Sequence, residues 1–107
     1  MPEVIVAGWL AYEEKDRDFV LEEMNLVARE SLEEPGCIDY AVCADLDHSD
    51  RIRVFEHWDS RDSLTLHLTL PHVLKFRDAI ADRTRTGREL SLHELAKSEP
   101  MVSGSSK

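Results

Sequence analysis

The chain has 107 residues, enough for one compact domain and too few for two separate hydrophobic cores. Its 42% hydrophobic and 33% charged residues are typical of a globular protein rather than a disordered one. The net charge of −9 argues against nucleic acid and anionic lipid as partners, because both require a basic surface.

The N-terminus begins with Met1-Pro2-Glu3 and continues directly into an apolar segment. It lacks the basic region and the long apolar region of a signal peptide. No apolar run approaches the roughly 20 residues that a membrane span requires. We therefore expect a cytoplasmic protein without a membrane partner.

Residues 4–12 predict a first strand, because they are β-rich and almost entirely apolar, as in a strand covered on both faces. Residues 13–34 predict a helix, with apolar residues at helical spacing and charged residues opposite them. Asp16 or Asp18 is expected to cap the start of this helix, and Pro35-Gly36 to end it.

Two segments of alternating polarity, residues 37–45 and 52–58, predict a β-hairpin around turn-forming residues 45–50. Alternation assigns one set of side chains to a covered face: Ile38, Tyr40, Val42, Ile52, Val54, Glu56 and Trp58. Cys37 and Cys43 would lie about 20 Å apart along the first of these strands. A disulfide needs Cα atoms within about 7 Å, so we expect both thiols to be free.

A short helix is predicted after Asp59 or Ser60, either of which can cap it. One side of this helix carries three neighbouring residues: Leu64, His67 and Leu68. Pro71 suits the first turn of a further helix, where its missing N–H is not needed. The expected buried stripe of that helix is Val73, Phe76 and Ile80.

A turn near Gly87 is expected to lead into a last strand over residues 90–97. Residues 98–107 are polar and predict a flexible C-terminal tail, which leaves residues 1–97 as the single domain. The basic cluster of the chain is interpreted as a solvated loop: Arg83, Arg85 and Arg88.

The predicted order β-α-β-β-α-α-β is that of an α+β, ferredoxin-like domain with an antiparallel four-stranded sheet. Helices on one face would leave the other face of the sheet bare. Apolar residues are expected on that bare face: Trp9, Ala41, Cys43 and Phe55. An exposed apolar face indicates a partner, and a second copy packed sheet to sheet would cover it.

Three segments carry a family resemblance: EPGCIDYAV, FEHWDSRDSL and HLTLPHVLKF. With the hairpin between them, they resemble the antibiotic biosynthesis monooxygenase family of small dimeric α+β-barrel proteins, over about residues 4–97. The resemblance implies a homodimer whose two sheets form a shared barrel, with a pocket between sheet and helices in each subunit. Several members oxidise phenols or quinols with O₂ without metal or flavin, others degrade haem, and some isomerise a small phosphorylated metabolite.

Haem-degrading members need an Asn on the first strand, a Trp at the end of the third strand and a His in the third helix. Trp58 matches the Trp, whereas Gly8 stands at the Asn position and Arg77 near the His position. The resemblance therefore disfavours haem degradation.

Oxygenation without a cofactor needs a general base that deprotonates the substrate in a dry pocket, and histidine suits this role at neutral pH. The candidate catalytic residues are His67 and His72. His72 lies at a helix start, which favours the neutral form of its ring. The expected substrate-binding residues are Trp58, Glu56, Tyr40 and Phe76. Glu56 is an inward carboxylate, which is costly unless it is paired or part of a site.

No metal or other cofactor is predicted. His67 and His72 are five residues apart, about 140° around a continuous helix, and spacing supplies no third ligand. Sequence patterns for nucleotides, flavins and serine hydrolases are absent. Three hypotheses follow: a cofactor-independent monooxygenase acting on a small aromatic molecule, an isomerase acting on a small polar metabolite, and a non-catalytic dimeric binding protein.

Overall fold

The computed structural model describes residues 1–102. Its elements are β1 (Val4–Tyr12), α1 (Glu14–Ser31), β2 (Cys37–Ala44), β3 (Arg51–Trp58), α2 (Arg61–His67), α3 (Pro71–Ala79) and β4 (Arg85–Glu94). This is the predicted ferredoxin-like order. Within the described residues, every helix is too short or too polar to cross a bilayer.

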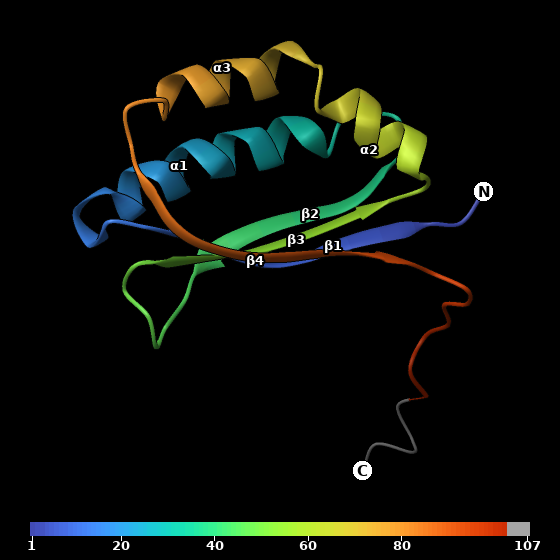
Figure 1. Ribbon diagram of the computed structural model, residues 1–107. Helices are drawn as coiled ribbons and strands as arrows, with labels where there is room; N and C mark the ends of the chain where they lie inside the picture. The colour runs from blue at the N-terminus through green and yellow to red at the C-terminus, as the bar shows by residue number, and fades with distance from the viewer. Residues whose placement is uncertain (103–107) are drawn as a thin grey trace.

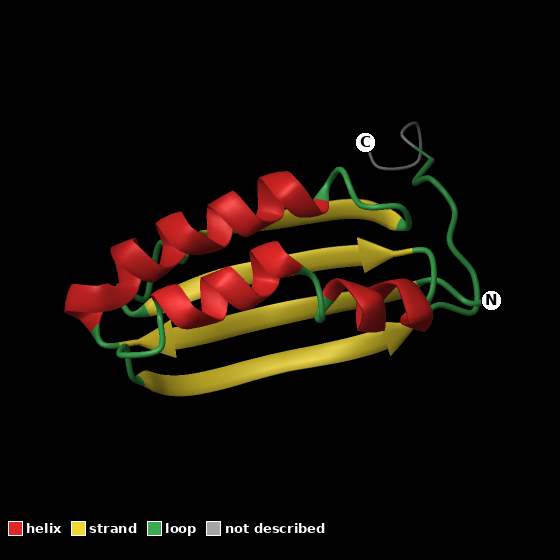
Figure 2. Ribbon diagram, turned by 90° about the horizontal axis from the view of Figure 1, so that it is seen from above, coloured by secondary structure: helices red, strands yellow, loops and turns green. Residues whose placement is uncertain are grey.

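The strands form one antiparallel sheet in the order β2-β3-β1-β4, with β1 paired to β3 on one side and to β4 on the other. All three helices lie over the same face of this sheet (Figure 1). Seen from above, they leave one edge strand uncovered (Figure 2), in keeping with the exposure of most residues of β4. The sheet therefore has a covered face, an open face and an open edge.

The core lies between the helices and the covered face. One cluster contains Val4, Val27, Ala28, Tyr40, Trp58 and Val73, and the other contains Tyr12, Val20, Met24, Ile52 and Val54. Ile52 and Trp58 have no exposed surface, which confirms the predicted covered face of β3. This alternation along β3 places the intervening Glu56 side chain under the helices as well.

The predicted covered face of β2 is correct for Tyr40 but wrong for Ile38, which is 48% exposed. The pairing register shifts there, since Cys37 lies opposite Trp58 whereas Asp39 lies opposite His57. The extra residue is a β-bulge, which turns Cys37 instead of Ile38 toward the core. Both cysteines are free, as predicted.

The start of α1 differs from the prediction. The N-cap is Glu13, without a side-chain hydrogen bond, so the expected cap by Asp16 or Asp18 is wrong. Asp16 lies in the first turn, where its carboxylate is buried and accepts a hydrogen bond from Arg83 Nη1 at 2.9 Å. A carboxylate at this position also interacts favourably with the helix dipole. Arg83 is thereby fixed on α1.

The last strand begins at Arg85, whereas the sequence predicted a start at residue 90. Gly87 lies inside β4, opposite Ala11, and does not form the predicted turn. The interpretation of Arg85 and Arg88 as loop residues is therefore wrong. β4 is an edge strand with most side chains in solvent, and such strands carry charges in place of apolar alternation.

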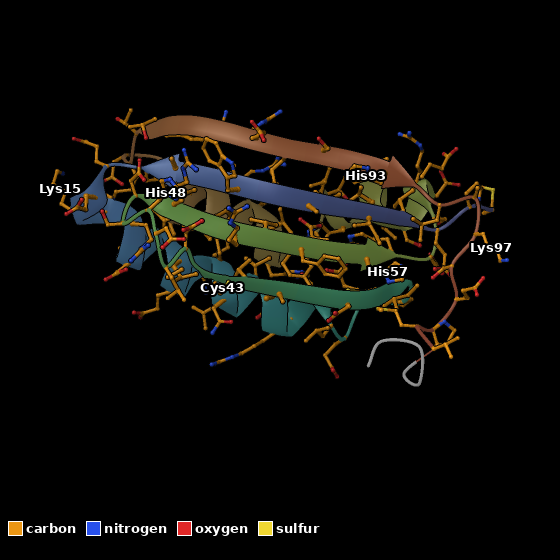
Figure 3. All side chains as sticks on the ribbon, turned by 90° about the horizontal axis from the view of Figure 1, so that it is seen from below. Lys15, Cys43, His48, His57, His93 and Lys97 are labelled. Carbon is orange, nitrogen blue, oxygen red and sulfur yellow. The ribbon has the colours of Figure 1, made fainter. Side chains whose placement is uncertain are left out.

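The open face of the sheet is seen from below in Figure 3. On it, Phe55 pairs with Ala41 of β2 and with Ala7 of β1. The Arg51 guanidinium lies 3.9 Å from the centre of the Trp9 ring. The face thus has an apolar centre bordered by charged and polar side chains.

Residues 98–102 form neither helix nor strand. The remaining residues of the predicted tail, 103–107, lie outside the described residues.

Candidate active site

The turn that follows α1 packs closely against α2. Gly36 has φ +91°, a conformation that glycine adopts without strain, and a Cβ here would overlap the Ser63 hydroxyl. The Asp59 N–H donates to the Gly36 carbonyl oxygen at 2.8 Å. This close packing brings Glu34, two residues before Gly36, next to the end of α2.

The two candidate histidines lie on either side of the break between α2 and α3. His67 is the last residue of α2 and is 2% exposed. Ser60 caps α2 by accepting a hydrogen bond from Ser63 N, and Pro71 occupies the first turn of α3, both as predicted. The change of helix direction brings the rings of His67 and His72 to 6.0 Å between centroids.

Glu34 joins the two rings through a single oxygen. Its Oε2 lies 2.8 Å from His67 Nδ1 and 2.7 Å from His72 Nε2. A carboxylate oxygen accepts, so His67 donates from Nδ1 and Nε2 is left as the proton acceptor of its ring. The Glu34 carboxylate is almost fully buried, with 9% of the side chain exposed, which strengthens both contacts.

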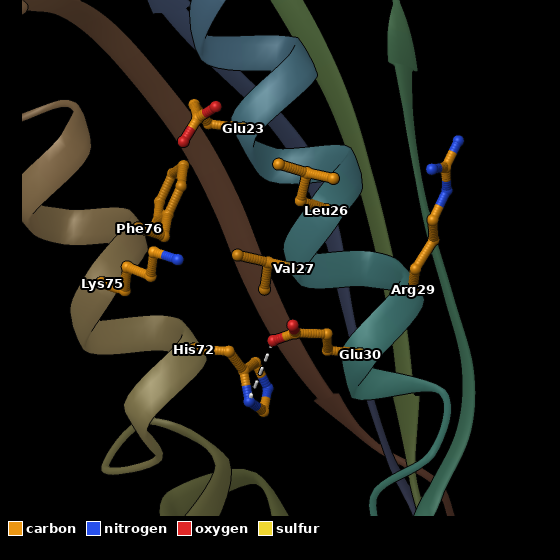
Figure 4. A pocket seen from close by; sticks show the side chains of 8 residues that line it. All are labelled: Glu23, Leu26, Val27, Arg29, Glu30, His72, Lys75 and Phe76. Carbon is orange, nitrogen blue, oxygen red and sulfur yellow. Dashed lines mark ion pairs between the residues drawn. The ribbon is translucent and has the colours of Figure 1, made fainter.

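His72 is placed differently from His67. Its Nδ1 lies 3.6 Å from Glu30 Oε2, so both ring nitrogens face carboxylates. The ring lies in a groove of about 310 Å³ between α1 and α3, shown from close by in Figure 4. The Nε2 atom of His72 is thus hydrogen-bonded to Glu34, and this contact helps to position that carboxylate.

A second cavity, of about 250 Å³, lies between the sheet and the helices. Four of the predicted site residues line it: Tyr40, Glu56, His67 and Phe76. Its apolar lining comes from Leu10, Met24, Val27, Val54, Leu68, Val73 and Leu90. The cavity combines a largely apolar lining with a histidine, a carboxyl and a phenol, which makes it the candidate active site.

Trp58 does not line this cavity and has no exposed surface. Its ring centroid is 4.7 Å from that of His67 and 6.3 Å from that of Tyr40, and the Tyr40 contact is edge to face. Its indole N–H donates to Glu56 Oε1 at 3.1 Å. Trp58 therefore orients three side chains of the site.

Glu56 and Tyr40 are directly opposite each other on β3 and β2. Burial raises the pKa of Glu56 above its ordinary value, and the hydrogen bond from Trp58 partly offsets this rise. Burial, together with the negative charge of Glu56, also raises the pKa of Tyr40. The buried end of the cavity thus holds two groups that favour their protonated forms.

Sequence reasoning missed four residues of the site. Glu34 stands in the EPGC segment, but no periodicity places it beside His67. The other three are arginines that line the same cavity: Arg77, Arg85 and Arg88. Arg88 was interpreted as a loop residue, although it precedes Leu90 by two residues. On one strand this spacing puts both side chains on the same face, and Leu90 also lines the cavity.

Within residues 1–102, Glu34, His67 and His72 are the three residues placed to hold a metal ion, with ligand atoms within 4.8 Å of one another. The break between α2 and α3 at Pro71 brings His67 and His72 together, and the turn after α1 supplies Glu34 as the third ligand. An ion at this position would replace the hydrogen bonds that fix the His67 tautomer. The arrangement can therefore act as a hydrogen-bonded base or as a metal site, but not as both at once.

The backbone of β1 bears on haem degradation. Gly8 has φ +146°, and a Cβ here would overlap the Glu89 carbonyl oxygen. The asparagine that the resemblance associates with haem degradation does not fit this strand.

Comparisons with known proteins agree with this architecture. A model of the antibiotic biosynthesis monooxygenase family matches residues 4–79. A crystal structure of a candidate antibiotic biosynthesis monooxygenase from Deinococcus radiodurans is similar, with 25% identity, a TM-score of 0.80, and coverage of 92% of this chain and 98% of that one. A counterpart from Chloroflexus aurantiacus has 22% identity, a TM-score of 0.78, and coverage of 92% and 97%. No curated protein matches.

A conserved protein of unknown function from Bacteroides thetaiotaomicron, described as a possible oxidoreductase, has the same fold. It shares 20% identity with a TM-score of 0.77, covering 88% of this chain and 98% of that one.

Proposed function

Since the chain belongs to the antibiotic biosynthesis monooxygenase family, we propose that it is a cofactor-independent monooxygenase that oxidises a small phenol or quinol with O₂. The observation that carries this proposal is the buried hydrogen bond between Glu34 and His67, at the wall of an apolar cavity. A carboxylate that holds the far nitrogen of a histidine is the arrangement that general-base catalysis uses elsewhere.

In the first step, Nε2 of His67 removes the phenolic proton of the substrate. Glu34 stabilises the imidazolium that forms, because its charge lies 2.8 Å from Nδ1. Apolar side chains around the ring exclude water, so the phenolate keeps its reactivity toward O₂.

In the second step, the phenolate transfers electrons to O₂ and a ring carbon forms a bond to one oxygen atom. The O–O bond then breaks, and His67 returns its proton to the oxygen that leaves as water. The ring C–H and the phenolic O–H supply the two hydrogens of this water. Phenol and O₂ give quinone and water, so the substrate supplies all four electrons and no external reductant is needed.

Glu56 and Tyr40 are proposed to bind a second oxygen of the substrate. Both favour their protonated forms and face the cavity from neighbouring strands. Phe76 provides an aromatic surface for the substrate ring. Trp58 keeps Glu56 in place through its indole N–H.

We further propose that the protein acts in the cytoplasm as a homodimer joined through the open faces of two sheets. The apolar centre around Phe55, Ala7 and Ala41 supports this proposal, because exposed apolar faces of this kind form interfaces. Covering the face would leave the cavity free, since the cavity opens on the other side of the sheet.

An isomerase remains the second candidate, because one observation favours it. Glu56 and His67 line one cavity, and a protonated carboxyl with a basic imidazole is the pair that enolisation requires. Solvent deuterium entering a substrate without O₂ consumption would distinguish this reaction from oxygenation. The binding-protein hypothesis predicts a cavity filled by Trp58, Phe76 and Leu68, and those side chains leave about 250 Å³ open.

Oxygen uptake by the purified protein with a panel of quinols tests the proposal. We expect uptake with at least one quinol, a strong loss in His67→Ala and a smaller loss in His72→Ala. Absence of uptake, or uptake unchanged in both variants, would contradict the proposal.

A further inference from the structure

The solvent end of the cavity carries positive charge, although the whole chain has a net charge of −9. Its lining includes three arginines, all exposed, and one carboxyl group, that of Glu56. Tyr40, Glu56 and His67 lie at the buried end. The cavity therefore runs from a buried polar and aromatic end to a cationic mouth formed by Arg77, Arg85 and Arg88.

These three arginines lack the carboxylate partners that four other arginines of the chain have. Arg17 contacts Asp18, Arg53 contacts Asp45, Arg61 contacts Glu94 and Arg83 contacts Asp16. Within the part of the chain that the structure describes, Arg77, Arg85 and Arg88 form no ion pair. Their guanidinium groups are free to bind an anion from solution.

The cationic mouth is formed by two different elements. Arg77 lies in the last turn of α3, next to Phe76. Arg88 and Arg85 lie on β4, opposite Leu10 and Tyr12, on the face of the sheet that the helices cover. Guanidinium groups reach the opening from α3 and from β4, an arrangement suited to carboxylate or phosphate oxygens, which arginine binds with paired N–H groups.

We infer that the substrate is an anion: a small aromatic molecule whose ring enters the apolar part of the cavity and whose carboxylate or phosphate group binds the cationic mouth. This inference rests on the proposed function and narrows its substrate class. A ring held at its acidic end by Arg88 and Arg77 would present its phenolic end to His67, as the base requires. The volume of about 250 Å³ limits the molecule to one or two rings.

Ligand binding without O₂ tests the inference separately from turnover. Hydroquinone, its carboxylated form gentisate, and hydroquinone monophosphate would be titrated anaerobically by calorimetry. We expect at least one of the two acids to bind about tenfold or more tightly than hydroquinone, since charge-assisted hydrogen bonds have this strength. Added salt should weaken binding of the acid and leave binding of hydroquinone nearly unchanged.

Single substitutions identify which arginines contact the acidic group of the ligand. Arg88→Gln and Arg77→Gln should each weaken binding of the preferred acid about tenfold and leave hydroquinone unaffected. Arg61→Gln is the matched control, because Arg61 is an exposed arginine that pairs with Glu94 away from the cavity. All three positions are exposed, so thermal unfolding should report the same folded state for each variant.

Equal binding of acids and hydroquinone, or acid binding that all arginine variants retain, would overturn the inference. If the acids bind through the arginines but O₂ is never consumed, the anion site stands and the monooxygenase proposal fails. If neutral quinols are oxidised and the arginine variants change nothing, the proposed function stands and the anion site is rejected.

Discussion

Glu34 and His67 are 33 residues apart in the sequence, yet the carboxylate Oε2 of one lies 2.8 Å from the ring Nδ1 of the other. The glycine turn after α1 creates this contact, because Gly36 packs directly on Ser63 of α2. The contact fixes the His67 tautomer and leaves Nε2 as the acceptor nitrogen of a ring that lines the cavity. The proposed chemistry depends on this relationship.

Glu34→Gln should therefore reduce kcat for oxygen uptake by about 10²- to 10⁴-fold, because the carboxylate fixes the tautomer of the proposed base. Glutamine keeps the shape of the side chain but removes the charge that stabilises the imidazolium. Glu33→Gln is the matched control, because Glu33 is the exposed neighbour. Equal rates in the two variants would contradict a positioning role for Glu34.

Glu56 makes the stability of the protein depend on pH. Burial raises its pKa in the folded state, so the folded protein holds the proton to higher pH than the unfolded chain does. Stability should then fall as the pH rises from about 4.3, the ordinary value for Glu, through the raised folded-state value. Glu56→Gln lacks this fall and should gain stability relative to the wild type between pH 4 and pH 7.

Urea denaturation at both pH values measures this gain, with Glu33→Gln as the exposed control. A difference between Glu56→Gln and the wild type that is the same at pH 4 and pH 7 would show that the carboxyl is not perturbed by folding.

Gly8→Ala should destabilise the protein by more than about 1 kcal/mol, because its φ of +146° suits glycine alone and the new Cβ meets the Glu89 carbonyl. Gly87→Ala is the comparison on the neighbouring strand. Its backbone has no positive φ, and the new Cβ would approach the Trp9 ring at 3.3 Å. Chemical denaturation should show the smaller loss for Gly87→Ala, and the reverse order would contradict the described β1 backbone.

Light scattering on the wild type should give twice the chain mass of 12.3 kDa, because the open sheet face is expected to pair with a second copy. Phe55→Arg places a charge at the apolar centre of that face and should produce monomers. Leu26→Arg, at a half-exposed leucine of α1 on the helix side, should remain dimeric. A monomeric wild type would remove the proposed interface.

Local signals in the sequence were sufficient to predict much of the fold. The bounds of β1, the covered face of β3 and the start of α3 at Pro71 follow from alternation and from proline chemistry, and each is confirmed. The bulge at Ile38 and the early start of β4 have no such signal. A β-bulge adds only one residue to a strand, which leaves the composition of the strand unchanged. An exposed edge strand needs no apolar pattern.

The site was predicted less completely, for a related reason. Tyr40, Glu56, His67 and Phe76 were found because strand and helix periodicity turns them toward one space. Contacts between segments that are distant in the sequence were not predicted. The Glu34 contact depends on how one turn packs against α2, and the arginines reach the cavity through the pairing of β4 with β1. Neither relationship is encoded in spacing along the chain.

Oxygen-isotope labelling tests the central claim most directly. Enzyme treated with EDTA would be incubated with a responsive quinol under ¹⁸O₂, and the product analysed by mass spectrometry beside that of His67→Gln. We predict one labelled oxygen atom per product molecule with the metal-free enzyme, and a rate about 10²- to 10⁴-fold lower in His67→Gln. Product without label, or labelling at the same rate in His67→Gln, would contradict the claim that His67 drives oxygenation in this cavity.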